Sequence, residues 1–460
     1  MTLPAPGHAL AERYAAWIET LSSDDIPDAV RAVVRRQLRD VTGLCVAARQ
    51  SSYIAALREA CEDPGACTMI GHAAPASAAE AALVNGTAAH GEDYDDTFEG
   101  TPVHAGAVIV PAVLAACEKH ARSGGDVLKG IAVGVELMCR MALVTPGAIH
   151  RAGFHPTAVI GTLGATAGVG AALGLPAAQI ASALGIAGSL AAGIIEYLAE
   201  GTWTKRLHAG WAAQCGLRAA TLAKAGFAGP RTVLDGTHGF FRAFSNGDVE
   251  PDFAPLTADL GGRWLAGNIA FKPYACGTMA QPFIDCALAL REAGLEVADI
   301  TAIECDVGEG TVHRLWEPLE EKRRPPNGYA AKFSVPYCIA VAYFDGAAGL
   351  EQFTDARVTD PRVRDLAQRI AYRVDPKDEY PANYSGHLDV RLTDGTAREF
   401  RQPHLRGGRH GPLSDAELAE KFRANARFGG WEEARIADAG AVIEGLLDGS
   451  GISSLSSLRG

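Results

Sequence analysis

The chain has 460 residues, of which 48% are hydrophobic and 21% are charged, values that are ordinary for a folded globular protein and argue against disorder. Its length exceeds the size at which one hydrophobic core stops growing, so two domains are expected. The net charge of −12 argues against a nucleic-acid partner, because binding of phosphates needs clustered Lys and Arg.

Residues 1 to 268 are predicted to be mostly helical, because apolar residues recur every three or four positions along this part. Asp126 is expected to cap the start of one of these helices. The predicted helices span about 3–21, 28–48, 107–124, 125–143, 157–175, 178–200 and 205–227.

Glycine marks one of these helices. Gly161, Gly164 and Gly168 recur at helical spacing and leave one stripe almost without side chains. A glycine inside a helix costs about 1 kcal/mol relative to alanine. Its repeated use predicts that another backbone packs closely against this stripe.

Residues 152–195 contain no Asp, Glu, Lys or Arg, which is long enough for a membrane span. Pro176 splits the stretch, and basic flanks and an aromatic belt are missing. We therefore predict two buried helices and no membrane partner.

The N-terminus has no apolar signal-peptide region, and the ten cysteines show no CxxC pair. This favours a cytoplasmic protein with buried free thiols and no zinc site.

The pattern changes after about residue 268. Strands are predicted at 300–308 and 369–375, a helix at 330–346, and a hairpin at 387–402 with Asp394-Gly395 at its turn. Helices return at 412–426, where Ser414 and Glu417 form a capping box, and at 432–449. The predicted fold is mainly α: a helical domain from both chain ends (1–268 and 409–460) and an inserted, lid-like α+β domain at 269–408.

The segment HGEDYDDTFEGTPVHAG, residues 90–106, concentrates carboxylates between two histidines. It could be a metal site, a solvated loop or one wall of a site that moves protons. Metal binding of the Mg²⁺ type would need a phosphate cradle or a second acidic motif, and neither is readable elsewhere in the sequence. A solvated loop fits less well with Tyr94 and Phe98 between the charges.

Further candidate side chains lie at helix starts and at the domain junction. His155 precedes Pro156 at a helix start, where anions are favoured. Lys205 and His208 share one face at the start of the helix predicted over 205–227, and their charge is unfavourable there unless an anion is bound. Lys272 lies at the predicted junction, where ligand sites often occur. Each could instead be a cap, a solvated turn or a surface lysine, and Tyr337 is expected in the core.

Carboxylates, histidines and lysines without a cofactor motif suit proton abstraction next to a carboxylate. The same segments resemble the MmgE/PrpD family, which includes 2-methylcitrate dehydratase, cis-aconitate decarboxylase and iminodisuccinate epimerase. The resemblance rests on NGTAAHGEDYDDT, FHPTAVIGTLGATAGVGAALGL, TKRLHAGWAAQCGLRAATLAKAGFAGP, FKPYACG and AAKFSVPYCIAVAYFDG, and extends from about residue 10 to 435.

The resemblance implies a homodimer that works without metal or organic cofactor on a small di- or tricarboxylic acid. It also implies the pocket residues, which are Asp93, Thr97, His104, His155, Lys205, His208, Lys272 and Tyr337. Decarboxylase-like members carry a histidine where this chain has Gly277, which weakens a decarboxylase assignment. Many relatives also read THP where this chain has Ala280-Gln281-Pro282.

The sequence thus predicts a cofactor-independent lyase, with water as the expected leaving group. Lys205 and Lys272 would bind substrate carboxylates, and His104 and His155 would act as base and acid in either order. Asp93 would orient His104, and Thr97, His208 and Tyr337 would contact the substrate. A decarboxylase, an epimerase and a non-enzymatic carboxylate-binding protein remain as alternatives.

Overall fold

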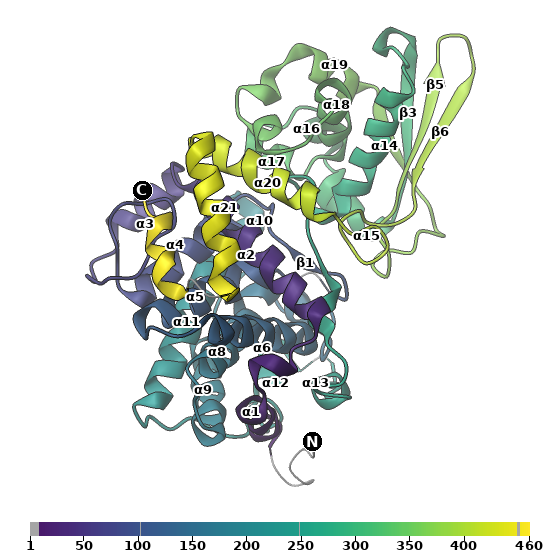
Figure 1. Cartoon of the computed structure of the whole chain (residues 1–460). Helices are drawn as coiled ribbons and strands as arrows, with labels where there is room; N and C mark the ends of the chain where they lie inside the picture. The colour runs from purple at the N-terminus through teal and green to yellow at the C-terminus, as the bar shows by residue number, and fades with distance from the viewer. Residues whose placement is uncertain (1–8, 102, 248, 449–450) are drawn as a thin grey trace. The chain divides into compact units, whose positions relative to one another are not determined.

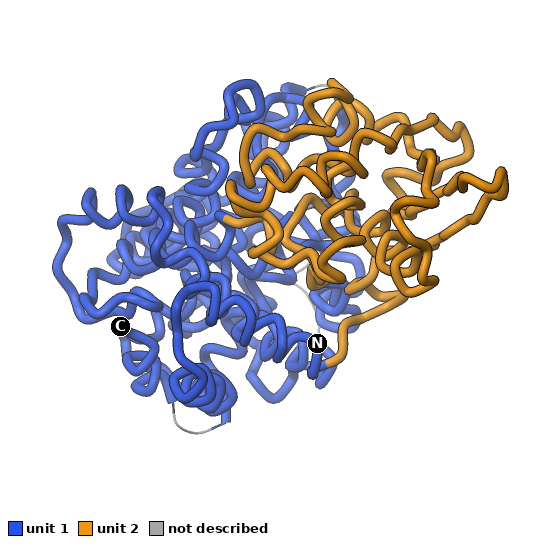
Figure 2. The backbone as a smooth tube through the Cα atoms, turned by 90° about the horizontal axis from the view of Figure 1, so that it is seen from above, with its two compact units in different colours: residues 1–91, 95–269, 415–460 blue, residues 92–94, 270–414 orange. Residues whose placement is uncertain are grey.

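The computed structural model describes residues 9–101, 103–247, 249–448 and 451–460 (Figure 1). It divides into two compact units, which are coloured blue and orange in Figure 2. Unit 1 takes residues up to 91, 95–269 and 415–460, and unit 2 takes 92–94 and 270–414. The predicted fold class is therefore confirmed: both ends of the chain build a helical unit, and a smaller α+β unit is inserted between them.

Unit 1 consists of helices and short 3₁₀ turns. Its helices are α1 (Leu10–Thr20), α2 (Asp28–Ala48), α3 (Ser52–Glu59), α4 (Ala78–His90), α5 (Gly106–Lys119), α6 (Gly124–Ala142), α7 (Ala148–Arg151), α8 (Pro156–Ala172), α9 (Ala177–Leu190), α10 (Tyr197–Glu200), α11 (Thr204–Lys224), α12 (Phe240–Phe244), α13 (Ala254–Thr257), α20 (Asp415–Phe428) and α21 (Glu433–Asp448). The turns are η1 (Ser23–Asp25), η2 (Leu265–Asn268) and η7 (Ile452–Leu458), and strand β1 (Thr97–Phe98) follows α4.

The core of unit 1 is formed by α4, α5, α6, α8 and α11, which pack on one another. Glycines make the α6–α8 contact possible. A Cβ on Gly168 would lie 2.7 Å from the carbonyl oxygen of Gly130, and a Cβ on Gly164 would lie 3.1 Å from that of Gly134. The prediction that another backbone packs on this stripe is confirmed, with α6 as the partner.

Two local predictions in unit 1 were wrong. The helix expected over 178–200 ends at Leu190, because Gly193 has a φ of +132°, which no helix accommodates. Asp126 is not the N-cap of α6: Ser123 is, and Asp126 lies three residues further on and accepts hydrogen bonds from the Ser123 backbone and hydroxyl.

Unit 2 pairs a sheet with helices. Its strands are β3 (Ile300–Val307), β4 (Ile370–Val374), β5 (Gly386–Leu392) and β6 (Ala397–Gln402), with β2 (Ile269–Ala270) at its boundary. Its helices are α14 (Gln281–Glu292), α15 (Glu309–Leu315), α16 (Leu319–Arg323), α17 (Gly328–Ala331), α18 (Val335–Asp345) and α19 (Pro361–Gln368), with turns η3 (Thr278–Ala280), η4 (Val297–Asp299), η5 (Leu350–Phe353) and η6 (Arg357–Thr359).

The sheet of unit 2 has the order β4-β3-β5-β6, with β3 and β4 parallel and the other pairs antiparallel. The predicted hairpin is confirmed: β5 and β6 pair antiparallel, and Gly395 in the turn has a φ of +84°. The single helix predicted over 330–346 is instead two, because Ser334 lies between α17 and α18 and caps α18 with its side chain.

The apolar stretch 152–195 behaves as predicted. It forms α8, which is buried from Thr157 to Ala172, and the whole of α9, which is buried along one side. Among the residues that the structure describes, no helix is long and apolar enough to cross a membrane. The ten cysteines are free, and all of them except Cys61 are buried.

Candidate active site

The acidic segment joins the end of α4 to the start of α5 and brings a carboxylate between two imidazoles. Asp95 Oδ2 lies 2.7 Å from Nδ1 of His90, and Asp95 Oδ1 lies 3.7 Å from Nδ1 of His104. Asp95 and His90 are 0% and 1% exposed, and His104 is 8% exposed. A carboxylate accepts hydrogen bonds when it is ionised, so Nδ1 of His90 carries a hydrogen in this contact.

Asp96 fixes the position of His104. Its carboxylate accepts hydrogen bonds from the backbone N–H of Gly106, at 2.9 Å, and from Nε2 of Gln37, at 2.6 Å. Its backbone carbonyl lies 2.6 Å from Nδ1 of His104 and can only accept, so this nitrogen donates. Nε2 is consequently the nitrogen of a neutral His104 that carries the lone pair. Burial raises the pKa of the Asp96 carboxyl to about 7, against the opposing hydrogen bonds of Gln37 and Gly106.

His155 and His208 form a second pair. His155 is the N-cap residue of α8, as predicted, and its backbone N–H donates to the carbonyl of Gly193. Its Nδ1 lies 3.1 Å from Nδ1 of His208, in the second turn of α11, so one ring donates and the other accepts. Tyr197 of α10 contacts both rings edge-on, with centroids at 6.0 and 5.7 Å.

The charges around this pair keep it neutral. Burial, and then the positive charges of His90 and Lys205, hold the pKa of His155 well below its ordinary value. Burial lowers the pKa of His208 to about 4, with further lowering by His90 and Lys205. Lys205 itself is half-buried in the first turn of α11. Both imidazoles are therefore uncharged near pH 7 and able to take up a proton.

His90 links His104 to the pair formed by His155 and His208. Its ring stacks on His155, with centroids 5.6 Å apart and an interplanar angle of 28°, and its centroid is 5.1 Å from that of His104. The four imidazoles thus form one cluster in unit 1, held by α4, α8, α11 and the segment before α5. Thr97, in the same segment, is buried, and its hydroxyl has no hydrogen-bond partner within the described parts of the chain.

The donor types of His90, Asp95 and His104 would also suit a divalent transition metal, and their ligand atoms lie within 4.8 Å of one another. A nitrogen that donates a hydrogen cannot ligate at the same time. Nδ1 of His90 and Nδ1 of His104 both face acceptors, Asp95 and the Asp96 carbonyl. These hydrogen bonds exclude ligation through the two Nδ1 atoms only, because a histidine that donates from Nδ1 can still bind a metal through Nε2.

The remaining predicted residues belong to unit 2. Lys272 is 2% exposed, and its Nζ donates to the backbone carbonyl of Asp93 at 2.8 Å. The carboxylate of Asp93 accepts a hydrogen bond of 3.0 Å from the hydroxyl of Tyr329. Asp93 has a φ of +54°, which Asp tolerates better than most residues. Tyr337 is fully buried in α18, as predicted for a core aromatic, and its hydroxyl donates to the Gln352 carbonyl.

A second buried lysine of unit 2 is bonded to the same acidic segment. Nζ of Lys332 donates to the carbonyl and the carboxylate of Glu92, at 2.6 and 2.9 Å, and the side chain is 2% exposed. Lys272, Tyr329 and Lys332 together hold residues 92–94 in unit 2, whereas His90 and Asp95 on either side belong to unit 1.

Two family models match the chain. The MmgE/PrpD N-terminal domain matches residues 12–252, and the MmgE/PrpD C-terminal domain matches residues 274–444. The chain belongs to the MmgE/PrpD family. Its relatives include the cis-aconitate decarboxylase of Homo sapiens, 32% identical over 356 residues that cover 75% of this chain and 72% of the relative. That of Aspergillus terreus is 28% identical over 436 residues, which cover 89% and 88%.

In this MmgE/PrpD chain, sequence reasoning grouped His104, His155, Lys205 and His208 but left out His90 and Asp95. Both stand in the segment HGEDYDD that drew attention to the site. The sequence offers five closely spaced carboxylates without indicating which faces a histidine. In the structure the carboxylate beside His104 is that of Asp95. The predicted contact of Asp93 with His104 stays a prediction.

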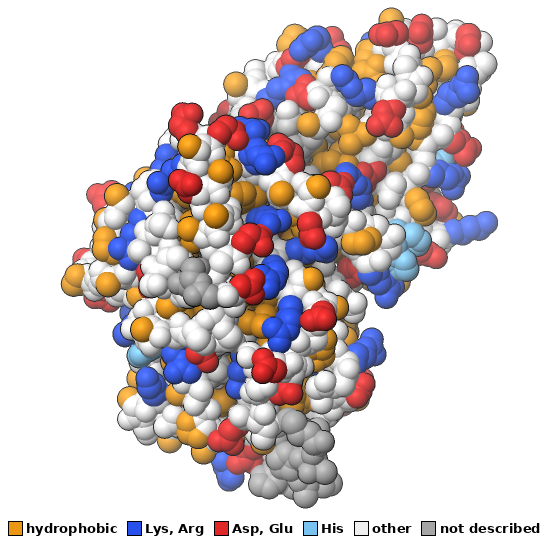
Figure 3. All heavy atoms as spheres, in the orientation of Figure 1, with side chains coloured by type: hydrophobic (Ala, Val, Ile, Leu, Met, Phe, Trp, Pro, Cys, Tyr) orange, Lys and Arg blue, Asp and Glu red, His pale blue; other side chains and the backbone are white. Residues whose placement is uncertain are grey.

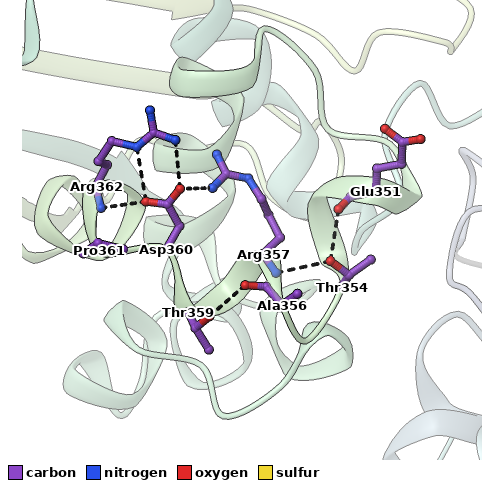
Figure 4. Close-up of a pocket in the computed structure, with 8 residues that line it drawn as sticks. All are labelled: Glu351, Thr354, Ala356, Arg357, Thr359, Asp360, Pro361 and Arg362. Carbon is purple, nitrogen blue, oxygen red and sulfur yellow. Dashed lines mark hydrogen bonds and ion pairs between the residues drawn. The ribbon is translucent and has the colours of Figure 1, made fainter.

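A surface pocket of unit 2 in the MmgE/PrpD chain contains none of the predicted residues (Figure 4). Figure 4 shows Asp360 between Arg357 and Arg362, with which it forms ion pairs. Arg357 is also paired with Asp345. Since these arginines are matched by carboxylates, the pocket does not resemble a site for a free di- or tricarboxylate.

Proposed function

We propose that this protein is a cofactor-independent lyase that acts on a small di- or tricarboxylic acid by proton transfer at the carbon next to a carboxylate. Family membership and the cis-aconitate decarboxylase relatives support a lyase for a small carboxylic acid. The observation that carries the proposal is the histidine cluster, in which His104 lies beside a carboxylate and His155 and His208 lie near cations.

Loss of water is the reaction that this asymmetry supports best. Elimination of water needs a base for the proton on carbon and an acid for the departing hydroxyl, whereas decarboxylation needs only a proton donor after CO₂ has left. The uncharged His155 would take the proton, the C–O bond would break with its electron pair leaving on oxygen, and protonated His104 would convert the hydroxide to water. Both histidines would then return to their starting states by exchange with solvent.

Lys205 and Lys272, as the family resemblance implies, are proposed to supply the positive charge that the intermediate needs. Removing a proton next to a carboxylate places negative charge on the carboxylate oxygens, and fixed ammonium groups stabilise that charge in a site with little water. Binding of an anionic substrate would also raise the pKa of the neighbouring histidines, because opposite charges favour their protonated forms. Thr97 and His208 are proposed to contact the substrate, and Asp93 to support His104, whereas Tyr337, fully buried and bonded to the Gln352 carbonyl, is not retained as a substrate contact.

Decarboxylation is the second candidate, and it is favoured by the relatives, which are cis-aconitate decarboxylases. Against it stands Gly277, where decarboxylase-like members carry a histidine. The glycine has room for a side chain with a small shift, since a Cβ there would lie 3.3 Å from the Phe333 ring. An epimerase, in which two histidines serve opposite faces of one carbon, is the third candidate.

The deciding experiment incubates the purified protein with citrate-, malate- and aspartate-like acids in H₂O and in D₂O. We expect an alkene product that has lost one water, detected by ultraviolet absorbance and mass spectrometry. Release of CO₂ would instead establish the decarboxylase. Deuterium in recovered substrate with no alkene would indicate the epimerase. If a diacid raised the melting temperature and no acid in the panel were converted, the protein would be a carboxylate-binding protein.

A further inference from the structure

The histidine cluster of unit 1 has two halves, and Asp95 belongs to the half that contains His90 and His104. Its two oxygens face different imidazoles, with Oδ2 at 2.7 Å from His90 and Oδ1 at 3.7 Å from His104. The carboxylate is completely buried. A buried carboxylate strongly favours the protonated form of an imidazole in contact with it, because little solvent screens the attraction.

His155 and His208 have no such partner. In the described parts of the chain, the ring contacts and side-chain hydrogen bonds of these two imidazoles are with each other, with His90 and with Tyr197. His155 also lies at the N-terminus of α8, where the helix dipole disfavours a cation. Protonation of His155 or His208 is therefore unfavourable.

His90 connects the two halves. It is 1% exposed, it is bonded to Asp95, and its ring contacts both His104 and His155. A protonated His90, balanced by Asp95, places a positive charge against the stacked face of His155. His90 therefore acts on His155 without needing to touch the substrate.

We propose that Asp95 and His90 are positioning residues that polarise the cluster, keeping His104 as the proton donor and His155 as the proton acceptor. This inference rests on the proposed function, because it assigns roles in the proposed reaction. Neither residue is among those that the resemblance implied for the pocket. The assignment also fixes which histidine acts as base, which the sequence left open.

The titratable and charged groups facing the cluster come from five parts of unit 1. They are His90 on α4, Asp95, Asp96 and His104 before α5, His155 on α8, Tyr197 on α10, and Lys205 and His208 on α11. Asp40 and Lys421 form a buried ion pair behind Asp96, and their charges balance. Among these groups, Asp95 is the carboxylate with ion-pair contacts to the imidazoles.

The test is the pH profile of kcat/KM for wild type and Asp95→Asn. The fall of kcat/KM at low pH reports protonation of the group that acts as base. The fall at high pH reports loss of the proton from the group that acts as acid. Without Asp95, His155 should be easier to protonate, because the buried carboxylate that favours a positive charge on the ring stacked against it is gone, and His104 should lose its proton more easily. The low-pH limb should move to higher pH and the high-pH limb to lower pH, each by about 1 unit or more, so that the bell-shaped profile of kcat/KM narrows. A bell that widens would overturn the assignment, and limbs that stay in place would overturn the polarising role.

A second variant tests the inference independently if Asp95→Asn does not fold. His90→Gln removes one positive charge from the neighbourhood of both His104 and His155, so both limbs should move to higher pH. A fall in rate at every pH with unmoved limbs would mean that His90 is only structural. Asp438→Asn, an exposed substitution on α21, is the matched control and should leave the profile unchanged.

An NMR titration of ¹³C-labelled histidine separates failure of this inference from failure of the proposed function, because it needs no turnover. Resonances are assigned with single His→Gln variants. In wild type, His104 should keep its proton to higher pH than His155, and Asp95→Asn should reduce this difference by about 1 pH unit or more. Equal titration of the two rings would overturn the inference even in an active enzyme. The predicted difference in an inactive protein would uphold it and count against the proposed lyase.

Discussion

At the scale of single residues, His104 and Lys205 make the most direct test of the proposed chemistry. His104→Asn keeps a donor near the Asp96 carbonyl but removes the proton carrier, so kcat should fall by about 100-fold or more. Lys205→Met removes the positive charge at the start of α11 and should lower kcat and raise KM. Steady-state kinetics on the substrate found in the acid panel measure both effects.

Matched substitutions show whether these losses are local. Lys224→Met changes the same residue type at the other end of α11, and His238→Asn changes an exposed histidine. Both controls should keep wild-type rates, and all four variants should keep the wild-type circular dichroism spectrum. Wild-type-like rates in His104→Asn and Lys205→Met would refute the mechanism.

The proposed reaction, which uses no metal, also predicts how the activity responds to metals. Because proton transfer would be carried by the histidines themselves, activity should survive dialysis against EDTA, and added Zn²⁺ should not raise it. The measurement is the rate before and after dialysis, with metal content determined by mass spectrometry. Loss of activity that returns with one divalent metal would show that the cluster is a metal site after all.

At the scale of elements, the contact between α6 and α8 makes a prediction about stability. Gly168→Ala places a methyl group 2.7 Å from the Gly130 carbonyl oxygen, so the helices must separate, and the free energy of unfolding should fall by about 1 to 3 kcal/mol. Gly440→Ala is the matched control on α21, because a Cβ there meets nothing within 4 Å. It should stabilise the protein by about 0.5 to 1 kcal/mol. Urea unfolding measures both, and equal effects would contradict the packing argument.

Periodicity predicted most of the long helices, because amphipathic spacing is a local property of the sequence, but it did not predict α4 or α14. The boundary of α9 was missed, since it depends on Gly193 adopting a positive φ and on its carbonyl accepting from His155. The break between α17 and α18 was missed for a similar reason, because a serine at a cap and a serine inside a helix look alike in sequence. Such choices depend on tertiary contacts rather than on propensity.

At the scale of the whole molecule, the family resemblance predicts a homodimer, and the surface of unit 1 supports it. Large apolar side chains are exposed around α11, including Trp203, Trp211, Leu222 and Phe227. Trp211 and Leu222 lie about three turns apart on one face of that helix. Exposed apolar clusters of this kind are typical of surfaces that bind another protein.

Light scattering after size exclusion should therefore give twice the 48.1 kDa of one chain. Trp211→Asp should reduce the mass toward that of one chain, because a charge opposes burial of this face. Lys224→Asp, on about the opposite side of α11, should not. A wild-type mass of one chain would contradict the dimer.

The face in Figure 3 carries interspersed Lys, Arg, Asp and Glu, unlike the basic surface of a nucleic-acid-binding protein.

The sequence by itself determined the fold class, the insertion of an α+β unit into a helical one and the close helix contact at the glycines, and it supplied the histidines and lysines that are proposed to carry the chemistry. These follow from periodicity, composition and motif spacing, which are properties of the chain. The tertiary structure decided which of the five carboxylates in HGEDYDDTFEGTPVHAG lies beside the histidines. That choice fell on Asp95, because the turn between α4 and α5 points its side chain at His90 and His104, and side-chain direction in an irregular turn is set by packing.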